Sequence, residues 1–290
     1  MAQSTYKTID YTGDTNASSI VLNKPSGVVD GDLMVAIIAW NSGSAYTLTT
    51  LSGWTLIRNT NTDSANLNIS SFYKIASSEG SSYTWSFSNS VEAVGATIRI
   101  DTFNSSTPVD TSNGASTSGG NTTSLTFADT ITPSLANELI LFPILARNSS
   151  ARNLTGHSAQ AVTTDNPTWT EILDILLDVA GGSEGTMNFS IAYSNRSATT
   201  ATGNSSATQG SSGSGANKYI SQKIAIKNQQ AFTFSNSDTV TVTDSETAHT
   251  NTSHITTETV TMTDDTDYTK GKDWSNPSKN TSSWTYPDKS

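Results

Sequence analysis

Short apolar runs separated by polar clusters are the feature that most limits how this chain can fold. The longest apolar runs, residues 33–40 and 139–146, each span only eight residues, and Ser, Asn, Gly and Asp cluster between the runs. This spacing is typical of strands joined by turns. Ser and Thr together make up about a third of the 290 residues, which favours strands and turns over helices. The sequence therefore predicts an all-β protein.

The apolar and alternating runs predict the positions of the strands. We expect strands at 19–22, 33–40, 55–58, 67–75, 83–87, 94–100, 124–127, 139–145, 169–179, 187–193 and 219–226. The run 169–179 also fits one face of a helix, but its alternation favours a strand. Between these strands, 104–123 and 194–217 are expected to be long polar loops.

An internal duplication is a second organising feature. Asp-Leu-Met-Val at 32–35 is echoed by Glu-Leu-Ile-Leu at 138–141, 106 residues later, and the surroundings of Trp54 are echoed around Trp169. Chance similarity in so biased a composition is the alternative. Two similar sets of strands favour two sheets packed face to face over a solenoid, which needs at least three repeats.

Charge and composition exclude several classes of function. The net charge is −10, so no basic surface is available to neutralise phosphates, and we expect no nucleic-acid binding. The apolar runs fall short of the ~20 residues that a membrane helix needs, and the N-terminus has no apolar signal segment. The chain is therefore expected to be made in a cytoplasm without membrane insertion. It contains no Cys, which excludes disulfides and thiolate sites.

Candidate metal ligands do not form a recognisable motif. His249 and His254 are five residues apart, so on an extended strand they point to opposite faces. Asp264, Asp265 and Asp267 lack the Gly and Glu spacing of a calcium-binding EF-hand loop. We expect no metal site and no cofactor.

No pattern typical of an enzyme is present either. There is no Gly-x-Ser-x-Gly motif, and His157 is expected in a loop. Glycosidase chemistry needs two facing carboxylates. The candidate pairs are Asp174 with Asp178, Asp101 with Glu92, and Glu79 with Glu184. Nothing distinguishes one pair from another, so we expect no catalytic residues and no enzymatic activity.

Aromatic residues are the ambiguous case. Trp40, Trp54, Trp85 and Trp169 lie in or beside predicted strands, where a ring either packs in the core or forms a platform for a sugar. Core packing is the favoured interpretation. No ligand-binding residue can be assigned from the sequence.

The composition changes after residue 228, and 229–290 is predicted to be an extended tail. Two Thr-rich segments, 238–244 and 258–264, repeat one pattern in which Thr alternates with Val or Met. A Trp-x-x-x-x-Lys pattern then occurs twice, ten residues apart. Strands formed by the two Thr-rich segments would have one apolar face and would need a partner sheet. The predicted assembly residues are Val240, Val242, Val260, Met262, Trp274 and Trp284.

Residues of about 20–228 resemble a domain found in tailed-phage structural proteins and some bacterial surface proteins. The likeness is carried by Lys24-Pro25-Ser26-Gly27, Gly31-Asp32-Leu33, Ser52-Gly53-Trp54-Thr55 and Phe72-Tyr73-Lys74. The resemblance implies a jelly-roll-like β-sandwich of the decoration or tail-fibre type, with no catalytic set.

Together these observations predict a two-sheet, jelly-roll-like sandwich over 1–228, followed by the tail over 229–290. The expected function is that of a non-catalytic structural protein on the surface of a tailed-phage virion. Its expected partners are other virion proteins and further copies of the chain, which would form a homo-oligomer. The alternative is a host-glycan-binding adhesin or receptor-binding module, whose partner is a surface glycan.

Overall fold

The structure is a computed structural model that describes residues 3–41, 46–61, 67–119, 124–148, 154–159, 168–177, 186–209 and 217–229. All of them belong to one compact unit, Met1–Phe234. The described residues contain thirteen strands and no helix, so none of them forms a helix able to cross a membrane. The strands are β1 (Thr5–Asn23), β2 (Leu33–Asn41), β3 (Thr55–Asn61), β4 (Leu67–Ile75), β5 (Ser82–Asp101), β6 (Val109–Gly119), β7 (Ser124–Phe127), β8 (Glu138–Asn148), β9 (Leu154–Ala159), β10 (Thr170–Leu177), β11 (Thr186–Arg196), β12 (Ser205–Gln209) and β13 (Asn217–Ile226).

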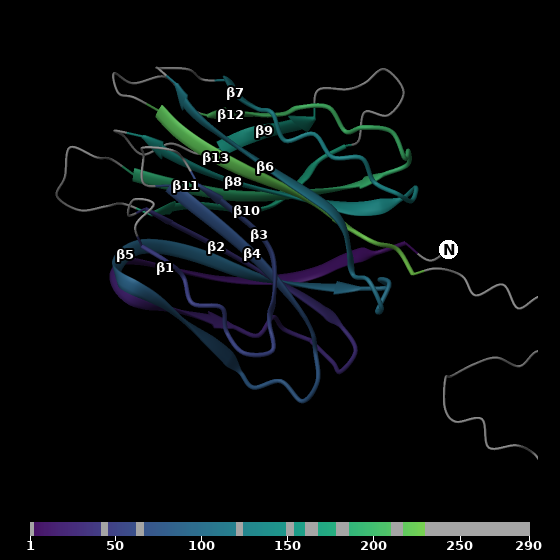
Figure 1. The fold of residues 1–290 in the computed structure, drawn as a ribbon, viewed down its shortest axis with the longest axis horizontal. Helices are drawn as coiled ribbons and strands as arrows, with labels where there is room; N and C mark the ends of the chain where they lie inside the picture. The colour runs from purple at the N-terminus through teal and green to yellow at the C-terminus, as the bar shows by residue number, and fades with distance from the viewer. Residues whose placement is uncertain are drawn as a thin grey trace, which may run out of the picture. The chain divides into compact units, whose positions relative to one another are not determined.

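Two five-stranded antiparallel sheets form the centre of the molecule (Figure 1). Sheet 1 has the strand order β1-β5-β2-β4-β3, and sheet 2, read from its β6 edge, has the order β6-β13-β8-β11-β10. The two orders are equivalent, because β6, β8, β10, β11 and β13 follow one another along the chain as β1 to β5 do. We call residues 5–101 the first half and 109–226 the second half. Leu33 and Leu139 align in the predicted duplication, and they are the first residue of β2 and the second residue of β8, the equivalent central strands.

Each central sheet carries an outer layer of strands. In the first half, β1 and β5 bend, and their paired ends from Ser19 to Asn23 and from Ser82 to Ser86 cover the outer face of β2. In the second half, the sheet β7-β12-β9 lies over the outer face of β8. Figure 1 shows this small sheet at the top and the bent β1 and β5 at the bottom. The central strands are therefore covered on both sides.

Among the described residues, three large apolar cores and a small one around Ile140 hold these layers together. The central core between sheets 1 and 2 includes Leu33 and Ile37 from β2 and Leu141 from β8. The first-half outer core contains Trp85. The second-half outer core contains Phe142. Residues 33–40 of β2 are all buried, which explains why this run is continuously apolar instead of alternating.

The all-β sandwich predicted from the sequence is confirmed, and 169–179 contributes a strand, β10, and not a helix. Two of the predicted loops are wrong. β6 lies within 104–123, and β12 lies within 194–217. The sequence of β6, Val-Asp-Thr-Ser-Asn-Gly-Ala-Ser-Thr-Ser-Gly, has no apolar alternation, because β6 is an edge strand whose regular hydrogen bonds to β13 do not depend on side chains.

Candidate functional site

The sequence-predicted sites are distributed differently in the structure. The assembly residues Val240, Val242, Val260, Met262, Trp274 and Trp284 lie outside the described residues, as do His249, His254 and the acidic turn at 264–267. His157 lies in β9, so its expected place in a loop is wrong.

Three of the four tryptophans predicted to pack in the core are buried there. Trp40, Trp54 and Trp85 are at most 5% exposed in the first-half outer core. Trp54 meets Trp85 edge-on with ring centroids 5.5 Å apart. Trp169 is half-buried and packs on Phe142. The three buried rings of Trp40, Trp54 and Trp85 offer no platform for a sugar.

Of the candidate carboxylate pairs, only Asp101 with Glu92 lies wholly within the described residues, and that pair is not brought together. Glu92 and Asp101 stand nine residues apart on β5, and each has another partner. Asn41 donates a hydrogen bond to Glu92, and Lys7 forms an ion pair with Asp101 at 2.9 Å. Asp178 and Glu184, the partners in the other two pairs, lie outside the described residues.

Three of the four motifs that carry the resemblance contain turns in the first half, and the fourth, Phe72-Tyr73-Lys74, lies within β4. Gly27, Gly31 and Gly53 all have positive φ angles, which glycine adopts most easily. Asp32, beside them, accepts hydrogen bonds from the Val29 N–H at 2.9 Å and from Nε of Arg99 at 2.7 Å. The three glycines and Asp32 are therefore explained by local structure.

The equivalent position in the second half is an acidic site that the sequence did not reveal. Glu138 begins β8 as Asp32 precedes β2, but the residue equivalent to Arg99 is Ala225, so the matching cation is missing. Glu138 is fully buried, and neither carboxyl oxygen forms a well-aligned hydrogen bond within the described residues. Burial, aided by the nearby Asp110 carboxylate, raises the pKa of Glu138 from 4.5 to about 8.

Asp110 has the opposite environment. Its carboxylate accepts hydrogen bonds from the Ser134 N–H at 2.6 Å and the Ser134 hydroxyl at 2.5 Å, and it pairs with Lys227 at 3.2 Å. Burial acts to raise the pKa of Asp110, but these contacts outweigh it and hold the pKa below its ordinary value. At neutral pH the pair therefore consists of a protonated Glu138 and an ionised Asp110. The alignment of Asp32 with Glu138 was the available signal.

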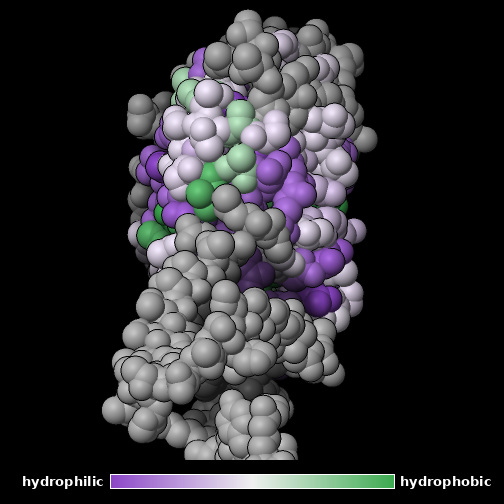
Figure 2. Space-filling view, turned by 90° about the vertical axis from the view of Figure 1, so that its right-hand side faces the viewer, coloured by the Kyte–Doolittle hydropathy of each residue, from purple (hydrophilic) through white to green (hydrophobic). Residues whose placement is uncertain are grey.

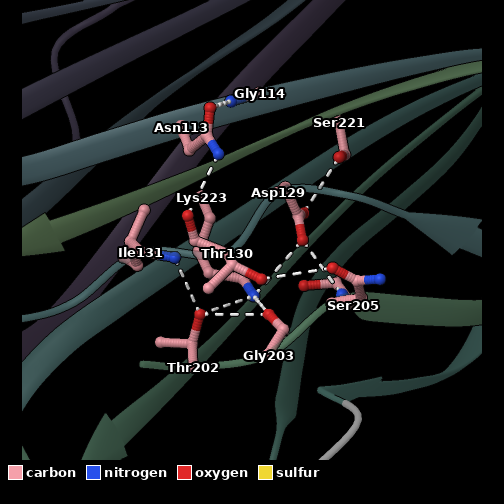
Figure 3. A network of polar contacts seen from close by, with 11 residues as sticks. Asn113, Gly114, Asp129, Thr130, Ile131, Thr202, Gly203, Ser205, Ser221 and Lys223 are labelled. Carbon is pink, nitrogen blue, oxygen red and sulfur yellow. Dashed lines mark hydrogen bonds and ion pairs between the residues drawn. The ribbon is translucent and has the colours of Figure 1, made fainter. Parts of the chain in front are cut away.

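A second polar cluster lies between sheet 2 and its outer layer (Figure 3). Lys223 on β13 and Asp129 after β7 form an ion pair at 3.3 Å, and both side chains are fully buried. The Lys223 ammonium also donates to Oγ1 of Thr202 at 3.1 Å and to the Gly203 carbonyl at 3.0 Å. Asp129 accepts from the Ser205 N–H and from the Ser221 hydroxyl. This cluster crosslinks two layers, and its two charged side chains are fully buried, so they cannot meet a substrate.

The acidic pair can hold a proton, but the full burial of Glu138 keeps it from contact with a ligand. No group of three or more His, Cys, Asp or Glu able to hold a metal occurs in the described part of the chain. No family model, curated protein or solved structure matches this chain. Its function must therefore be proposed from its own geometry.

The acidic pair gives a testable pH dependence. Because the folded-state pKa of Glu138 is raised, the folded protein binds this proton more tightly than the unfolded chain does, and stability falls as pH rises from about 4.5 to about 8. We expect a loss of about 2–4 kcal/mol, since the exposed Ser134 next to the pair admits some solvent screening. Glu138→Gln should remove this loss, as urea unfolding measured at a series of pH values would show.

The matched control for this prediction is Asp32→Asn in the first half, whose carboxylate has a cationic partner in Arg99. That variant should leave the fall between pH 4.5 and 8 in place. If Glu138→Gln has the same pH profile as the unsubstituted protein, the buried proton is not on Glu138. The lowered pKa of Asp110 affects stability only at more acidic pH, so the two effects are separable.

Proposed function

We propose that this chain is a non-catalytic structural protein on the exterior of a tailed-phage virion, as a capsid decoration or a tail-fibre component. One observation carries the proposal. The strand that leads into the tail, β13, lies inside sheet 2 and is hydrogen-bonded on both sides, to β8 and to β6. A strand paired on both sides is a favourable place to attach the segment that would hold the protein on a particle.

Several contacts fix the C-terminal end of β13 to the rest of the sandwich over 1–228, which we call the body. The Asn104 N–H donates to the Lys227 carbonyl at 2.9 Å, and the Asn228 side chain donates to the Ala136 carbonyl at 2.7 Å. The Ser4 N–H donates to Oδ1 of Asn228 at 2.9 Å. The start of β1 and the end of β13 therefore meet at one place, which Figure 1 shows near the label N.

This arrangement suits a protein that is anchored through its C-terminal segment, 229–290. A pull along β13 loads its hydrogen bonds to both neighbouring strands at the same time, and does not open them one after another. The body would then stay folded while its tail is held by a particle. The paired Val, Met and Trp repeats of 229–290 supply the apolar groups that such a hold requires.

The surface supports an exposed structural role. The coloured part of the face in Figure 2 is mostly pale and purple, and its apolar areas are small. Large apolar side chains with more than a third of their surface exposed are scattered among the described residues as Tyr11, Val21, Val29, Leu56 and Leu176. The low charged fraction of 14% with a net charge of −10 keeps the protein away from nucleic acid.

The alternative is a host-glycan-binding module, and one feature favours it. A surface hollow of about 490 Å³ lies at the bend of β1. Hydroxyl and amide side chains line it, from Thr12, Asn16, Ser18, Ser19 and Ser90. The hollow has no aromatic side chain in its lining, and the buried tryptophans cannot supply one, so the structural role is the better supported proposal.

Deleting 229–290 tests the proposal. The body keeps all its strands, so we expect it to fold cooperatively and to be absent from particles that carry the full-length protein. The measurement is the amount of each form in density-gradient-purified particles, with circular dichroism of the free protein as the control for folding. Normal incorporation of the truncated form would contradict the proposal, as would a body that cannot fold. If the body alone binds to host cells, the glycan alternative gains.

A further inference from the structure

The two halves pack on each other as the subunits of a two-fold symmetric dimer do. Edge strand β1 of sheet 1 contacts β10 of sheet 2, and the opposite edge strand β3 contacts β6. Since β6 is the equivalent of β1 and β10 is the equivalent of β3, these are the same contact made twice. The central core between the sheets takes its residues from both halves.

The strand ladders define which residues correspond. We take Val35 on β2 and Leu141 on β8 as equivalent, and count along the neighbouring strands from the residues paired with them. The equivalent pairs, with the first-half residue named first, are Tyr73 and Tyr193, Ile98 and Ile224, Ser71 and Ile191, Ala96 and Gln222, Arg58 and Leu173, and Ile9 and Ser112.

One side of this interface is polar. The Ser71 hydroxyl donates a hydrogen bond to Oε1 of Gln222, and both residues are fully buried. Nε2 of Gln222 donates to the Ile69 carbonyl at 2.9 Å and to Oγ1 of Thr60 at 3.1 Å. Every polar atom of the Gln222 side chain thus finds its partner on the other half.

The same side carries a second polar contact between the halves. Nη2 of Arg58 donates to the Ser112 carbonyl at 2.7 Å, and its Nε donates to the Ser112 hydroxyl at 3.2 Å. Gly114 lies on the same edge strand as Ser112, and a Cβ at this position would collide with the Thr60 side chain. The close approach of the two edges therefore requires this glycine.

The opposite side of the interface is apolar at the equivalent positions. Ile191 and Ala96 replace Ser71 and Gln222, and both are fully buried in the central core. Leu173 replaces Arg58 and belongs to the same core, and Ile9, in place of Ser112, packs against it. Each half thus presents one polar patch and one apolar patch to the other.

We propose that the central interface is a recognition surface between two separable modules, 3–104 and 106–229. Its polar side favours an unlike pair, in which a first half binds a second half, over a like pair of two identical halves. The partner of each inner sheet face is the other half, because only that pairing satisfies both patches. Two copies of the first half would place Arg58 against Ile9 and Ser71 against Ala96. Two copies of the second half would place Gln222 against Ile191. Buried polar groups would then lack partners, which disfavours like pairs.

The connection between the modules can be cut in the folded protein. Ser105, Ser106 and Thr107 are exposed and lie between β5 and β6. A protease site inserted after Ser105 in the full-length chain would be cleaved after folding. The cleaved chain is then unfolded in denaturant, refolded as a mixture, and analysed by native mass spectrometry, which counts each fragment in each complex.

Two pairs of substitutions then test the selection. Arg58→Leu with Ser71→Ile makes the polar patch of the first half apolar, and Ser112→Ile with Gln222→Ala does the same for the second half. We expect the unsubstituted fragments to form unlike pairs, with at least about tenfold fewer like pairs. With all four substitutions, the ratio of unlike to like pairs should fall several-fold, and the part that remains reflects the close approach that requires Gly114. Gln229→Ala, the same kind of change at an exposed position, is the control.

Two results would overturn the inference. The first is an unsubstituted mixture with like pairs as common as unlike ones, or fragments that do not recombine. This result stands even if the fourfold variant fails to fold. The second is a fourfold variant that folds and has the same ratio of unlike to like pairs as the unsubstituted fragments. Association through 229–290 would be equal in all variants, so it cannot imitate the expected change.

Discussion

Replacing Lys223 with Met is expected to lower the free energy of unfolding by about 3–5 kcal/mol, one of the two largest effects of a single substitution in this protein. The change leaves the Asp129 carboxylate buried without a cation, at a position where both side chains are fully buried. Thermal or urea unfolding would measure the loss. Lys7→Met is the matched control, because Lys7 and its partner Asp101 lie partly in solvent and their ion pair contributes little.

A double-mutant cycle separates the charge from the hydrogen bonds. Asp129→Asn keeps an acceptor for the Ser205 N–H but leaves Lys223 as a lone buried cation. Lys223→Met combined with Asp129→Asn removes both charges, so the double variant should be more stable than the two single losses predict. Additive losses would show that the two groups do not interact.

The Asp129→Asn variant also has a pH signature. Burial lowers the pKa of Lys223, and Asp129 opposes that shift. Without Asp129 the folded-state pKa falls further below its unfolded value of 10.5, so the folded protein binds fewer protons than the unfolded chain. The free energy of unfolding of this variant should therefore rise with pH between the lowered folded-state pKa of Lys223 and 10.5. A constant stability would mean that Lys223 is not buried in solution.

The sequence predicts the fold where burial determines the pattern. β2 and β8 are covered on both faces, so their apolar runs are continuous and easily recognised. The strand predicted within 169–179 is confirmed, because Leu173, Ile175 and Leu177 alternate along β10. The edge strand β6 has no such pattern, because its backbone pairing with β13 requires no particular side chain.

The buried polar groups could not be placed from the sequence. Lys223 stands in an apolar strand, and alternation alone assigns it to the outer face of a sheet, where a lysine is ordinarily exposed. That face is covered only because residues from β7 to Asp129 and from Thr202 to β12 fold over it. Such a covering layer depends on contacts between residues far apart in the sequence, which local patterns do not contain.

Glu138 is a second buried polar group whose environment could not be predicted from the sequence. The duplication aligns it with Asp32, and the two residues stand at equivalent places, Asp32 directly before β2 and Glu138 at the first residue of β8. The difference lies in a third residue, since Arg99 accompanies Asp32 and Ala225 stands at the equivalent place beside Glu138. That the Glu138 carboxyl is buried without a matching cation can therefore be recognised only when the neighbouring strands are known.

Replacing Trp54 with Ala is expected to cost about 3–5 kcal/mol of folding free energy, because the ring fills the first-half outer core. Trp54 is 5% exposed and meets Tyr83 edge-on with ring centroids 5.1 Å apart, besides its contact with Trp85. Small rearrangements cannot fill so large a cavity. Urea unfolding followed by circular dichroism would measure the cost.

Trp169 is the natural comparison for Trp54, because each residue stands directly before an equivalent strand, β10 or β3. Trp169 is only half-buried against Phe142, so Trp169→Ala should cost less, about 1–2 kcal/mol. If Trp54→Ala instead keeps its stability and abolishes attachment to host cells, the ring acts in recognition and the glycan alternative replaces the structural proposal. If both variants lose stability in the expected order, the two tryptophans are core residues of two equivalent modules.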